Sequence, residues 1–192
     1  VNLNYRLLQA LSHEPLDRFP VWLMRQAGRY LPSYQKLRKT ATLKELFTTK
    51  ELIVEATLLP LKPLGPDAAI LFSDITIIAL AMGLDLDFKE GIGPVIHPQM
   101  TDFTALQQLT NTMEALTVIG EAIVELKRLL TVPLIGFCGA PFTVACNFSD
   151  KKHLYRCPKS FQLLLRKITD TTKEYLRLQI MNGVDVIQIF DS

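Results

Sequence analysis

Four apolar runs alternate with helical segments along this chain of 192 residues, and this alternation constrains its fold more than any other feature. The runs cover residues 19–24, 68–73, 132–137 and 184–190. Each is apolar at nearly every position, which is typical of strands buried on both faces of a parallel sheet. The alternation therefore predicts an α/β fold built on such a sheet.

Helical periodicity fills the gaps between these runs. Residues 51–59, 112–130 and 160–181 repeat apolar side chains every three or four positions, as helices with one buried face do. The Asn-Gly pair at 182–183 is a natural end for the last helix. Residues 83–98 alternate weakly between apolar and polar side chains, and we expect a β-hairpin there, inserted after the second strand.

Polar or turn residues follow the four predicted strands at their C-terminal ends: Arg25, Asp74, residues 138–141 and Asp191. In a (β/α)8 barrel the C-terminal ends of all strands open onto one mouth, so these residues would meet there. A doubly wound open sheet, the alternative, usually carries a glycine-rich phosphate loop after its first strand. The Gly91-Ile92-Gly93 segment lies in the hairpin region instead. The order of elements therefore favours an α/β fold of the TIM-type (β/α)8 barrel class.

Two arginines four residues apart follow the first predicted strand. Arg25 and Arg29 carry their charge at any working pH, and a guanidinium binds carboxylate or phosphate oxygens in a bidentate manner. Gly28 lets the backbone come close to a ligand, and Gln26, Ala27 and Gly28 would offer backbone N–H groups. The pattern predicts a site for a ligand with several carboxylates or phosphates. A surface loop with two ordinary arginines is the alternative.

A carboxylate ends the second predicted strand. Asp74 follows the mostly apolar residues 69–73, and a charge without a partner at such a position would cost a large desolvation energy. Its partner is therefore a ligand, or else Asp74 caps a helix or forms a salt bridge with Arg25 or Arg29.

Composition excludes several classes of function. The chain has 48% hydrophobic and 21% charged residues and a formal net charge of +2, without the clustered basic stripe of a nucleic-acid interface. No apolar stretch reaches the roughly 20 residues of a membrane span. The N-terminus lacks the apolar core of a signal peptide, so we expect a cytoplasmic protein without nucleic-acid or membrane partners. Cys138, Cys146 and Cys157 match no zinc or disulfide spacing, which predicts reduced thiols and no metal.

Four segments resemble the signatures of the uroporphyrinogen decarboxylase family, in the order in which that family carries them. They are Met-Arg-Gln-Ala-Gly-Arg-Tyr-Leu-Pro at 24–32, Phe-Ser-Asp-Ile at 72–75, Gly-Phe-Cys-Gly-Ala-Pro-Phe-Thr at 136–143 and Ile-Phe-Asp-Ser at 189–192. The resemblance implies a (β/α)8 barrel. It also implies a carboxy-lyase that needs no cofactor and decarboxylates the four acetate side chains of uroporphyrinogen III, yielding coproporphyrinogen III in porphyrin and heme biosynthesis.

The same resemblance implies roles for individual residues. Asp74 would accept the pyrrole N–H groups of the substrate and stabilise the cation that forms when a pyrrole carbon is protonated. Arg25 and Arg29 would hold acetate and propionate side chains. Proton donation by one of these arginines is a further hypothesis, which a guanidinium pKa above about 12 disfavours. Ser192 would contact a substrate side chain, and the protein would be a homodimer.

Two features depart from the family pattern. A barrel of this type typically needs about 250 residues, and only four strands are predicted here. We therefore expect residues 1–192 to be a single domain that forms the N-terminal portion of a longer barrel, and activity of these residues alone is not assured. After residues 140–146 the family has a tyrosine; either Asn147 replaces it here or a short segment is missing, and the second interpretation fits the following residues better.

Two other functions compete with the decarboxylase. A zinc- and corrinoid-linked methyltransferase would share the barrel, but it needs a His-x-Cys type thiolate site, and no such spacing is present. A non-catalytic porphyrinogen-binding fragment would keep Arg25, Arg29 and Asp74 and would bind its ligand without turnover.

Overall fold

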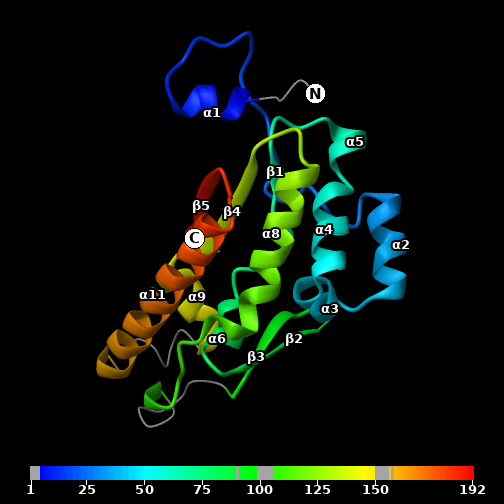
Figure 1. Ribbon diagram of the computed structural model, residues 1–192. Helices are drawn as coiled ribbons and strands as arrows, with labels where there is room; N and C mark the ends of the chain where they lie inside the picture. The colour runs from blue at the N-terminus through cyan, green and yellow to red at the C-terminus, as the bar shows by residue number, and fades with distance from the viewer. Residues whose placement is uncertain (1–4, 90, 99–105, 150–155, 157) are drawn as a thin grey trace. The chain divides into compact units, whose positions relative to one another are not determined.

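The computed structural model describes residues 5–89, 91–98, 106–149, 156 and 158–192, and Figure 1 shows their helices and strands. The chain divides into two compact units. Unit 1 comprises Val1–Ser73, Val118–Phe137 and Gln179–Gln188, and unit 2 comprises Asp74–Thr117, Cys138–Leu178 and Ile189–Ser192.

A parallel sheet of three strands forms the framework. The strands are β1 (Ala69–Ile70), β4 (Leu134–Gly139) and β5 (Val186–Phe190), in the order β1-β4-β5. Strand β1 pairs parallel with β4, Ala69 opposite Leu134. The Asp185 N–H donates to the Leu134 carbonyl at 2.9 Å and the Ala140 N–H to the Phe190 carbonyl at 2.8 Å, so β5 also runs parallel to β4. This sheet confirms three of the four predicted strands, of which β1 is the shortest.

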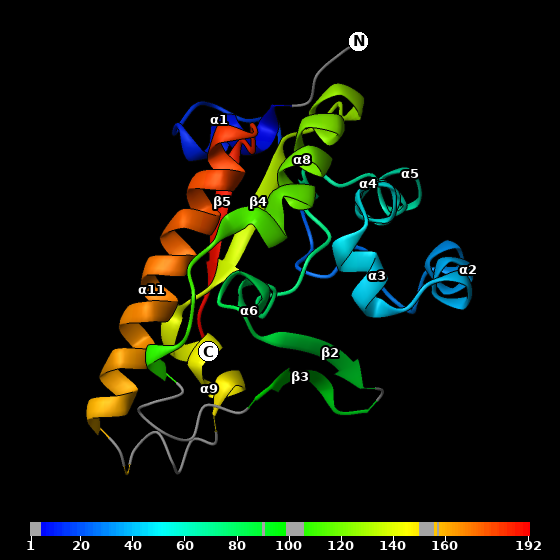
Figure 2. The same cartoon turned by 60° about the horizontal axis from the view of Figure 1, so that its bottom comes forward.

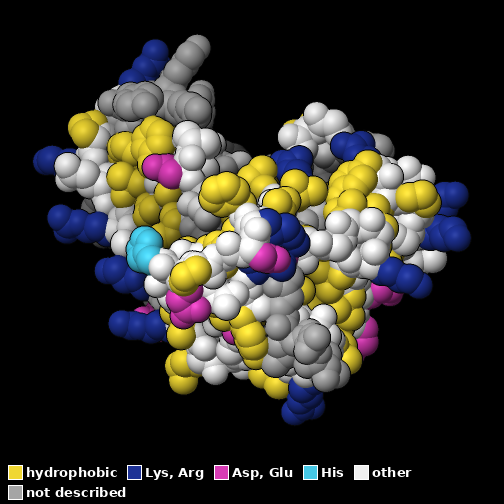
Figure 3. Space-filling model, turned by 90° about the horizontal axis from the view of Figure 1, so that it is seen from above, with side chains coloured by type: hydrophobic (Ala, Val, Ile, Leu, Met, Phe, Trp, Pro, Cys, Tyr) yellow, Lys and Arg dark blue, Asp and Glu magenta, His cyan; other side chains and the backbone are white. Residues whose placement is uncertain are grey.

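The first of the four predicted strands, residues 19–24, is wrong. Phe19 is 88% exposed and Val21 54% exposed, and the segment is not a strand. The Val21 N–H donates to the Asp67 carboxylate, and the Val21 carbonyl accepts the Asp67 N–H. Pro20 has no N–H to donate to a neighbouring strand. The apolar run therefore predicts burial that the described part of the chain does not provide. Exposed hydrophobic side chains also lie beside Lys and Arg on the face seen in Figure 3.

The predicted helices are confirmed with small shifts in their ends. Helix α4 is Lys50–Leu58, α8 is Thr117–Leu129 and α11 is Pro158–Met181. The 3-10 turn η1 (Met113–Leu116) leads into α8. Gly183, with φ of 106°, stands just after α11, where a left-handed residue ends a helix readily.

Four further helices belong to unit 1: α1 (Arg6–Leu11), α2 (Pro32–Thr40), α3 (Leu43–Thr48) and α5 (Leu61–Leu64). Helices α2, α3 and α4 lie side by side in Figures 1 and 2. They share one core cluster of Leu31, Tyr34, Leu37, Leu46 and Ala56. Phe72, just after β1, stacks on Phe47 with ring centroids 5.0 Å apart and contacts Tyr34 at 5.8 Å. This core therefore packs α2 and α3 against the residues that follow β1.

Unit 2 contains the predicted hairpin. Strands β2 (Asp85–Lys89) and β3 (Gly93–His97) pair antiparallel, with Leu86 opposite Ile96. Both of these side chains are buried, whereas Asp85 is exposed, as alternation on a half-buried ribbon requires. Unit 2 also holds α6 (Ile78–Ala81), and α9 (Pro141–Phe148), which contacts β3.

Candidate functional site

The two arginines predicted to bind a ligand lie in a tight loop of unit 1. Residues 25–29, which we call the arginine loop, connect the exposed segment 19–24 to α2. Arg25 and Arg29 are exposed, and neither guanidinium makes a hydrogen bond or ion pair with another described residue. Both charges are therefore free to meet a ligand.

The backbone of the arginine loop is braced from its C-terminal side. The Tyr30 hydroxyl donates to the carbonyl oxygens of Gln26 and Arg25, the latter at 3.3 Å. Burial raises the pKa of Tyr30, so the hydroxyl keeps the proton that it donates. The Gln35 side chain donates to the Arg29 carbonyl at 2.6 Å. Because these bonds fix the backbone at both arginines, their side chains start from defined positions.

The residues between the arginines, which were predicted to bind a ligand, also make contacts that hold the loop in place. Gln26 is only 1% exposed, and its Oε1 accepts the Leu23 N–H at 3.1 Å. Ala27 packs against the core cluster of α2, α3 and α4. A Cβ on Gly28 would lie 3.1 Å from the Tyr30 ring, so the absence of a side chain there lets the tyrosine approach. Ligand binding by the N–H groups of these residues stays a prediction.

Asp74 is the first residue of unit 2 and is half-buried. Its Oδ1 accepts the Thr76 N–H at 2.8 Å and the Thr76 hydroxyl at 2.5 Å, the geometry of an Asx turn. Asp74 is not the helix cap that was considered as an alternative, because the N-cap of α6 is Ile77 and no side chain caps it. The carboxylate instead holds the turn before α6 with one of its two oxygens. Oδ2 has no hydrogen-bond partner within the described residues, so the carboxylate can still accept donors from a ligand.

Thr76 is a residue that sequence reasoning missed. Its side chain is fully buried, and both of its donors bind the same oxygen of Asp74. It therefore fixes the orientation of the carboxylate. The Asp-x-Thr spacing, which is common where a side chain caps a turn, is the signal that could have identified it.

The C-terminal ends of β4 and β5 meet in unit 2. The Thr143 hydroxyl, in the first turn of α9, donates to Asp191 Oδ1 at 2.8 Å and accepts the Ser192 N–H at 3.0 Å. A Cβ on Gly139, the last residue of β4, would lie 3.0 Å from the Ile75 Cβ. The turn that carries Asp74 and the ends of two strands are therefore neighbours, as predicted. Sequence reasoning missed Thr143, which links the last two strands.

Two polar residues near this cluster do not carry ionic chemistry. Burial raises the pKa of the Cys138 thiol to about 11, so it stays protonated at neutral pH. Asn147 donates to the Thr143 carbonyl at 3.0 Å within α9. Both interpretations of Asn147, as a replacement of the family tyrosine or as the residue that follows a missing segment, stay predictions.

The described residues carry neither a metal-binding cluster nor a helix that could span a membrane. No group of three or more His, Cys, Asp or Glu side chains is placed to hold a metal ion. None of the described helices combines the length and the hydropathy that crossing a bilayer requires.

The chain is similar in sequence to a known protein family and to several of its members. The sequence model of the family described as Uroporphyrinogen decarboxylase (URO-D) matches residues 2–192. A uroporphyrinogen decarboxylase from Protochlamydia amoebophila is 44% identical over 203 residues, which include 100% of this chain and 56% of the relative. One from Thermus thermophilus is also 44% identical, over 99% of this chain and 59% of the relative.

A solved structure, a methyltransferase from Methanosarcina mazei, aligns with a TM-score of 0.74 at 27% sequence identity and covers 97% of this chain and 58% of its own. The chain thus spans somewhat more than half the length of the relatives that it matches.

Proposed function

Because the chain belongs to the uroporphyrinogen decarboxylase family, we propose that the protein decarboxylates the four acetate side chains of uroporphyrinogen III. The product is coproporphyrinogen III, and the reaction is a step of porphyrin and heme biosynthesis. The family fold is a TIM-type (β/α)8 barrel, to which the parallel sheet of this chain belongs. That residues 1–192 form the N-terminal portion of one barrel domain is part of the proposal.

The proposal rests on the hydrogen bonding of the two carboxylate oxygens of Asp74. Thr76 holds one oxygen of its carboxylate, and the other has no partner among the described residues. A half-buried anion fixed in this way is suited to accept pyrrole N–H groups, which converge at the centre of the flexible tetrapyrrole. It also stabilises positive charge on a pyrrole ring, more strongly as the substrate displaces water.

The arginine loop supplies the second element. Arg25 and Arg29 present two guanidiniums on a braced backbone, and uroporphyrinogen carries acetate and propionate side chains that such forks bind. Ser192, beside Thr143 and Asp191, would contact one of these side chains. We assign substrate binding to the whole loop, and a catalytic role to Asp74, Arg25 and Arg29.

The reaction follows from the chemistry of pyrrole. A proton adds to a ring carbon and makes a cation, and the bond between the acetate methylene and its carboxylate then breaks. Its electron pair moves into the ring as carbon dioxide leaves, and protonation of the methylene carbon with loss of the ring proton leaves a methyl group. The ring itself accepts the electrons, so the proposal includes no cofactor. The negative charge of Asp74 lowers the energy of the cation.

The Methanosarcina mazei structure favours methyl transfer as a second candidate function. Such chemistry needs an activated thiolate, and Cys138 is protonated because burial raises its pKa. The relatives named as decarboxylases are more similar, at 44% identity against 27%. Binding of porphyrinogen without turnover is the third possibility.

The test uses two proteins: the chain alone, and the chain joined to the part of the Thermus thermophilus relative that it does not span. Each is incubated with uroporphyrinogen III without oxygen, and the carboxyl groups of the products are counted chromatographically. We expect the joined chain to release products with successively fewer carboxyl groups, ending at coproporphyrinogen. Binding without carboxyl loss, or methyl transfer to a thiol with an added methylcorrinoid, would refute the proposal.

A matched pair of variants tests the arginine loop in the same assay. Arg25→Gln removes a charge-assisted contact, worth about tenfold or more in KM. Lys36→Gln removes one positive charge from an exposed position of α2 and leaves the loop intact, so its KM should match the wild type. Equal KM values for the two variants would exclude Arg25 from substrate binding.

Assembly and location are further parts of the proposal. We infer a homodimer that acts in the cytoplasm, as the resemblance to the family implies. Sedimentation equilibrium of the joined chain should give twice the mass of one chain, and a single-chain mass at working concentrations would reject the dimer.

A further inference from the structure

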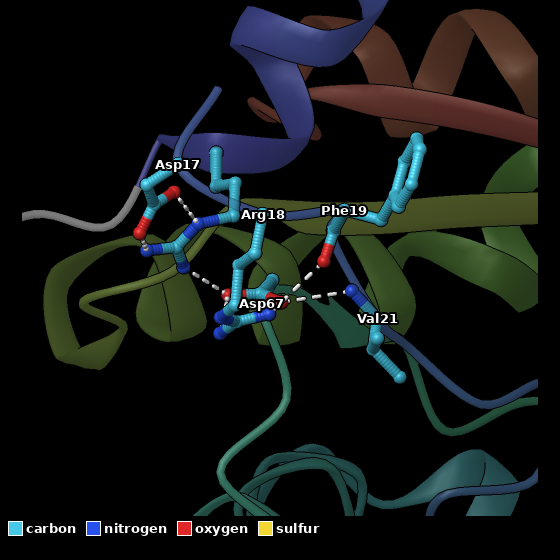
Figure 4. A network of polar contacts seen from close by, with 6 residues as sticks. Asp17, Arg18, Phe19, Val21 and Asp67 are labelled. Atoms are coloured by element: carbon cyan, nitrogen blue, oxygen red, sulfur yellow. Dashed lines mark hydrogen bonds and ion pairs between the residues drawn. The ribbon is translucent and has the colours of Figure 1, made fainter.

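A buried carboxylate outside the proposed catalytic residues anchors the segment that leads to the arginine loop. Asp67, just before β1, is 1% exposed. Figure 4 shows it at the centre of a network that also contains Asp17, Arg18 and Val21. Arg18 donates to both of its oxygens, at 2.7 and 2.8 Å, and Arg6 donates to Oδ1 at 2.5 Å. Two cations therefore compensate one buried anion.

The same carboxylate also holds main chain. The Val21 N–H donates to Asp67 Oδ2 at 2.8 Å, and the Asp67 N–H donates to the Val21 carbonyl at 2.8 Å. This reciprocal pair attaches the exposed segment 19–24 to the start of β1. Val21 stands four residues before Arg25, a span of about 14 Å at most. All of these residues belong to unit 1.

The arginine loop thus has anchors on both sides. Tyr30 and Gln35 hold its carbonyl groups from the C-terminal side, and Asp67 holds Val21 from the N-terminal side. Segment 19–24 makes no ladder with a neighbouring strand in the described part of the chain, and Phe19 is 88% exposed. Two other bonds to its backbone are local, from Arg18 to the Phe19 carbonyl and from the Leu23 N–H to Gln26. The bonds to Asp67 are the ones that tie the segment to the start of β1.

We propose that Asp67 is a positioning residue for the arginine loop: its carboxylate fixes Val21 and so sets where Arg25 and Arg29 present their guanidiniums. The identity of the ligand rests on the proposed function, whereas the anchoring does not. Asp67→Asn should loosen the loop, because an amide N–H₂ group faces donors that the carboxylate accepted. A misplacement of about 1 Å can cost up to 10²-fold in catalysis, and we expect KM to rise at least tenfold, with a smaller change in kcat.

Asp17→Asn is the matched control. Asp17 also accepts bonds from Arg6, at 2.7 and 2.9 Å, but it is exposed and does not contact Val21. Hydrogen exchange of the chain is followed by mass spectrometry on peptides that cover residues 19–30 and on peptides from α8. We expect faster exchange in residues 19–30 of Asp67→Asn alone, with α8 unchanged in both variants.

The outcomes separate the two claims. Faster exchange confined to residues 19–30 supports the anchor even if no protein form decarboxylates uroporphyrinogen, in which case only the proposed function fails. Wild-type exchange in residues 19–30 of Asp67→Asn overturns the anchor. Faster exchange throughout α8 also overturns it, because Asp67 would then maintain the fold as a whole.

A second pair of variants covers the case in which Asp67→Asn does not fold. Arg18→Gln removes the two bonds that a half-exposed guanidinium donates to Asp67 and its bond to the Phe19 carbonyl, and it leaves the contact between Asp67 and Val21. It should give a smaller increase in exchange of residues 19–30 and in the KM of the joined chain. Arg18→Lys keeps the charge and should bring the exchange rate and the KM most of the way back to the wild-type values. If Arg18→Gln exchanges residues 19–30 at the wild-type rate, the result counts against the anchor.

Discussion

Gly136 in β4 stands where no side chain fits, which leads to a quantitative prediction. A Cβ at this position would lie 2.3 Å from Gln179 Oε1 and 3.0 Å from the Val184 Cγ1 atom. Gln179, in α11, is fully buried, and its amide bonds both backbone groups of Phe137, each at 2.9 Å. The Gly136→Ala variant must therefore displace the amide that ties α11 to β4.

The cost of that displacement has two parts. A buried Phe137 N–H without a partner costs about 1–3 kcal/mol. Crowding of the core around Val184 costs about 1–3 kcal/mol more. We expect Gly136→Ala to lower the free energy of unfolding by about 4 kcal/mol, a large share of the 5–15 kcal/mol typical of a domain.

Urea unfolding with linear extrapolation measures this loss, and Gly120→Ala in α8 is the control. A Cβ on Gly120 would also meet an amide, that of Asn182 at 2.8 Å, but there it is the end of a half-exposed side chain. That side chain can turn away, and alanine favours the helix by about 1 kcal/mol. Gly120→Ala should therefore leave the stability within about 1 kcal/mol of the wild type.

A double-mutant cycle identifies the cause. In a Gln179→Ala background the amide is gone, so Gly136→Ala should cost about 2 kcal/mol less than it does in the wild type. Additive losses, or a loss below about 1 kcal/mol for Gly136→Ala alone, would show that the Gln179 amide does not exclude a side chain at position 136.

Three smaller predictions concern a thiol, a helix cap and an ion pair. The Cys138 pKa is raised from 9.0 to about 11, so the unfolded chain loses that proton first and the free energy of unfolding falls above pH 9. Urea unfolding measures this fall between pH 8 and pH 10. The fall should be about 1 kcal/mol larger in the wild type than in Cys138→Ala. Thr42→Ala removes the capping box of α3 and should cost about 1 kcal/mol in the same assay, whereas Thr48→Ala at the other end should cost clearly less. The Arg6 guanidinium lowers the pKa of Asp17 from 3.8 to about 2, so this pair stabilises the fold above pH 3.8 and ceases to do so as the pH falls towards 2. The Arg6→Gln substitution should return the Asp17 pKa towards 3.8, which an NMR titration measures. An unchanged pKa would contradict the pairing.

The sequence was informative where a residue's surroundings follow from its neighbours along the chain. Strand β4 is buried at all six positions, and its unbroken apolar run predicts this. Helix α8 has the expected three- and four-residue spacing, with Ile119, Ile123 and Leu126 buried. The hairpin turns at Gly91, with φ of 77°, a conformation that glycine adopts readily.

Sequence reasoning failed where a tertiary partner decides the outcome. Residues 19–24 are as apolar as a buried strand, yet no described strand pairs with their backbone, and their bonds to Asp67 depend on a residue more than forty positions away. The roles of Thr143 and Gln179 depend on hydrogen-bond partners that lie more than forty positions away along the chain. No local pattern announces such contacts, so they become visible only in three dimensions.

If the Asp74 carboxylate enables decarboxylation, replacing it with an amide in the Asp74→Asn variant should lower kcat. The joined chain, its Asp74→Asn variant and the control Asp87→Asn, which changes an exposed carboxylate of β2, are compared in coproporphyrinogen formation without oxygen. We expect a loss of about 10²–10³ in kcat for Asp74→Asn, as for other fixed groups that stabilise transition-state charge, and a wild-type rate for Asp87→Asn. A wild-type rate for Asp74→Asn would contradict this role of the carboxylate.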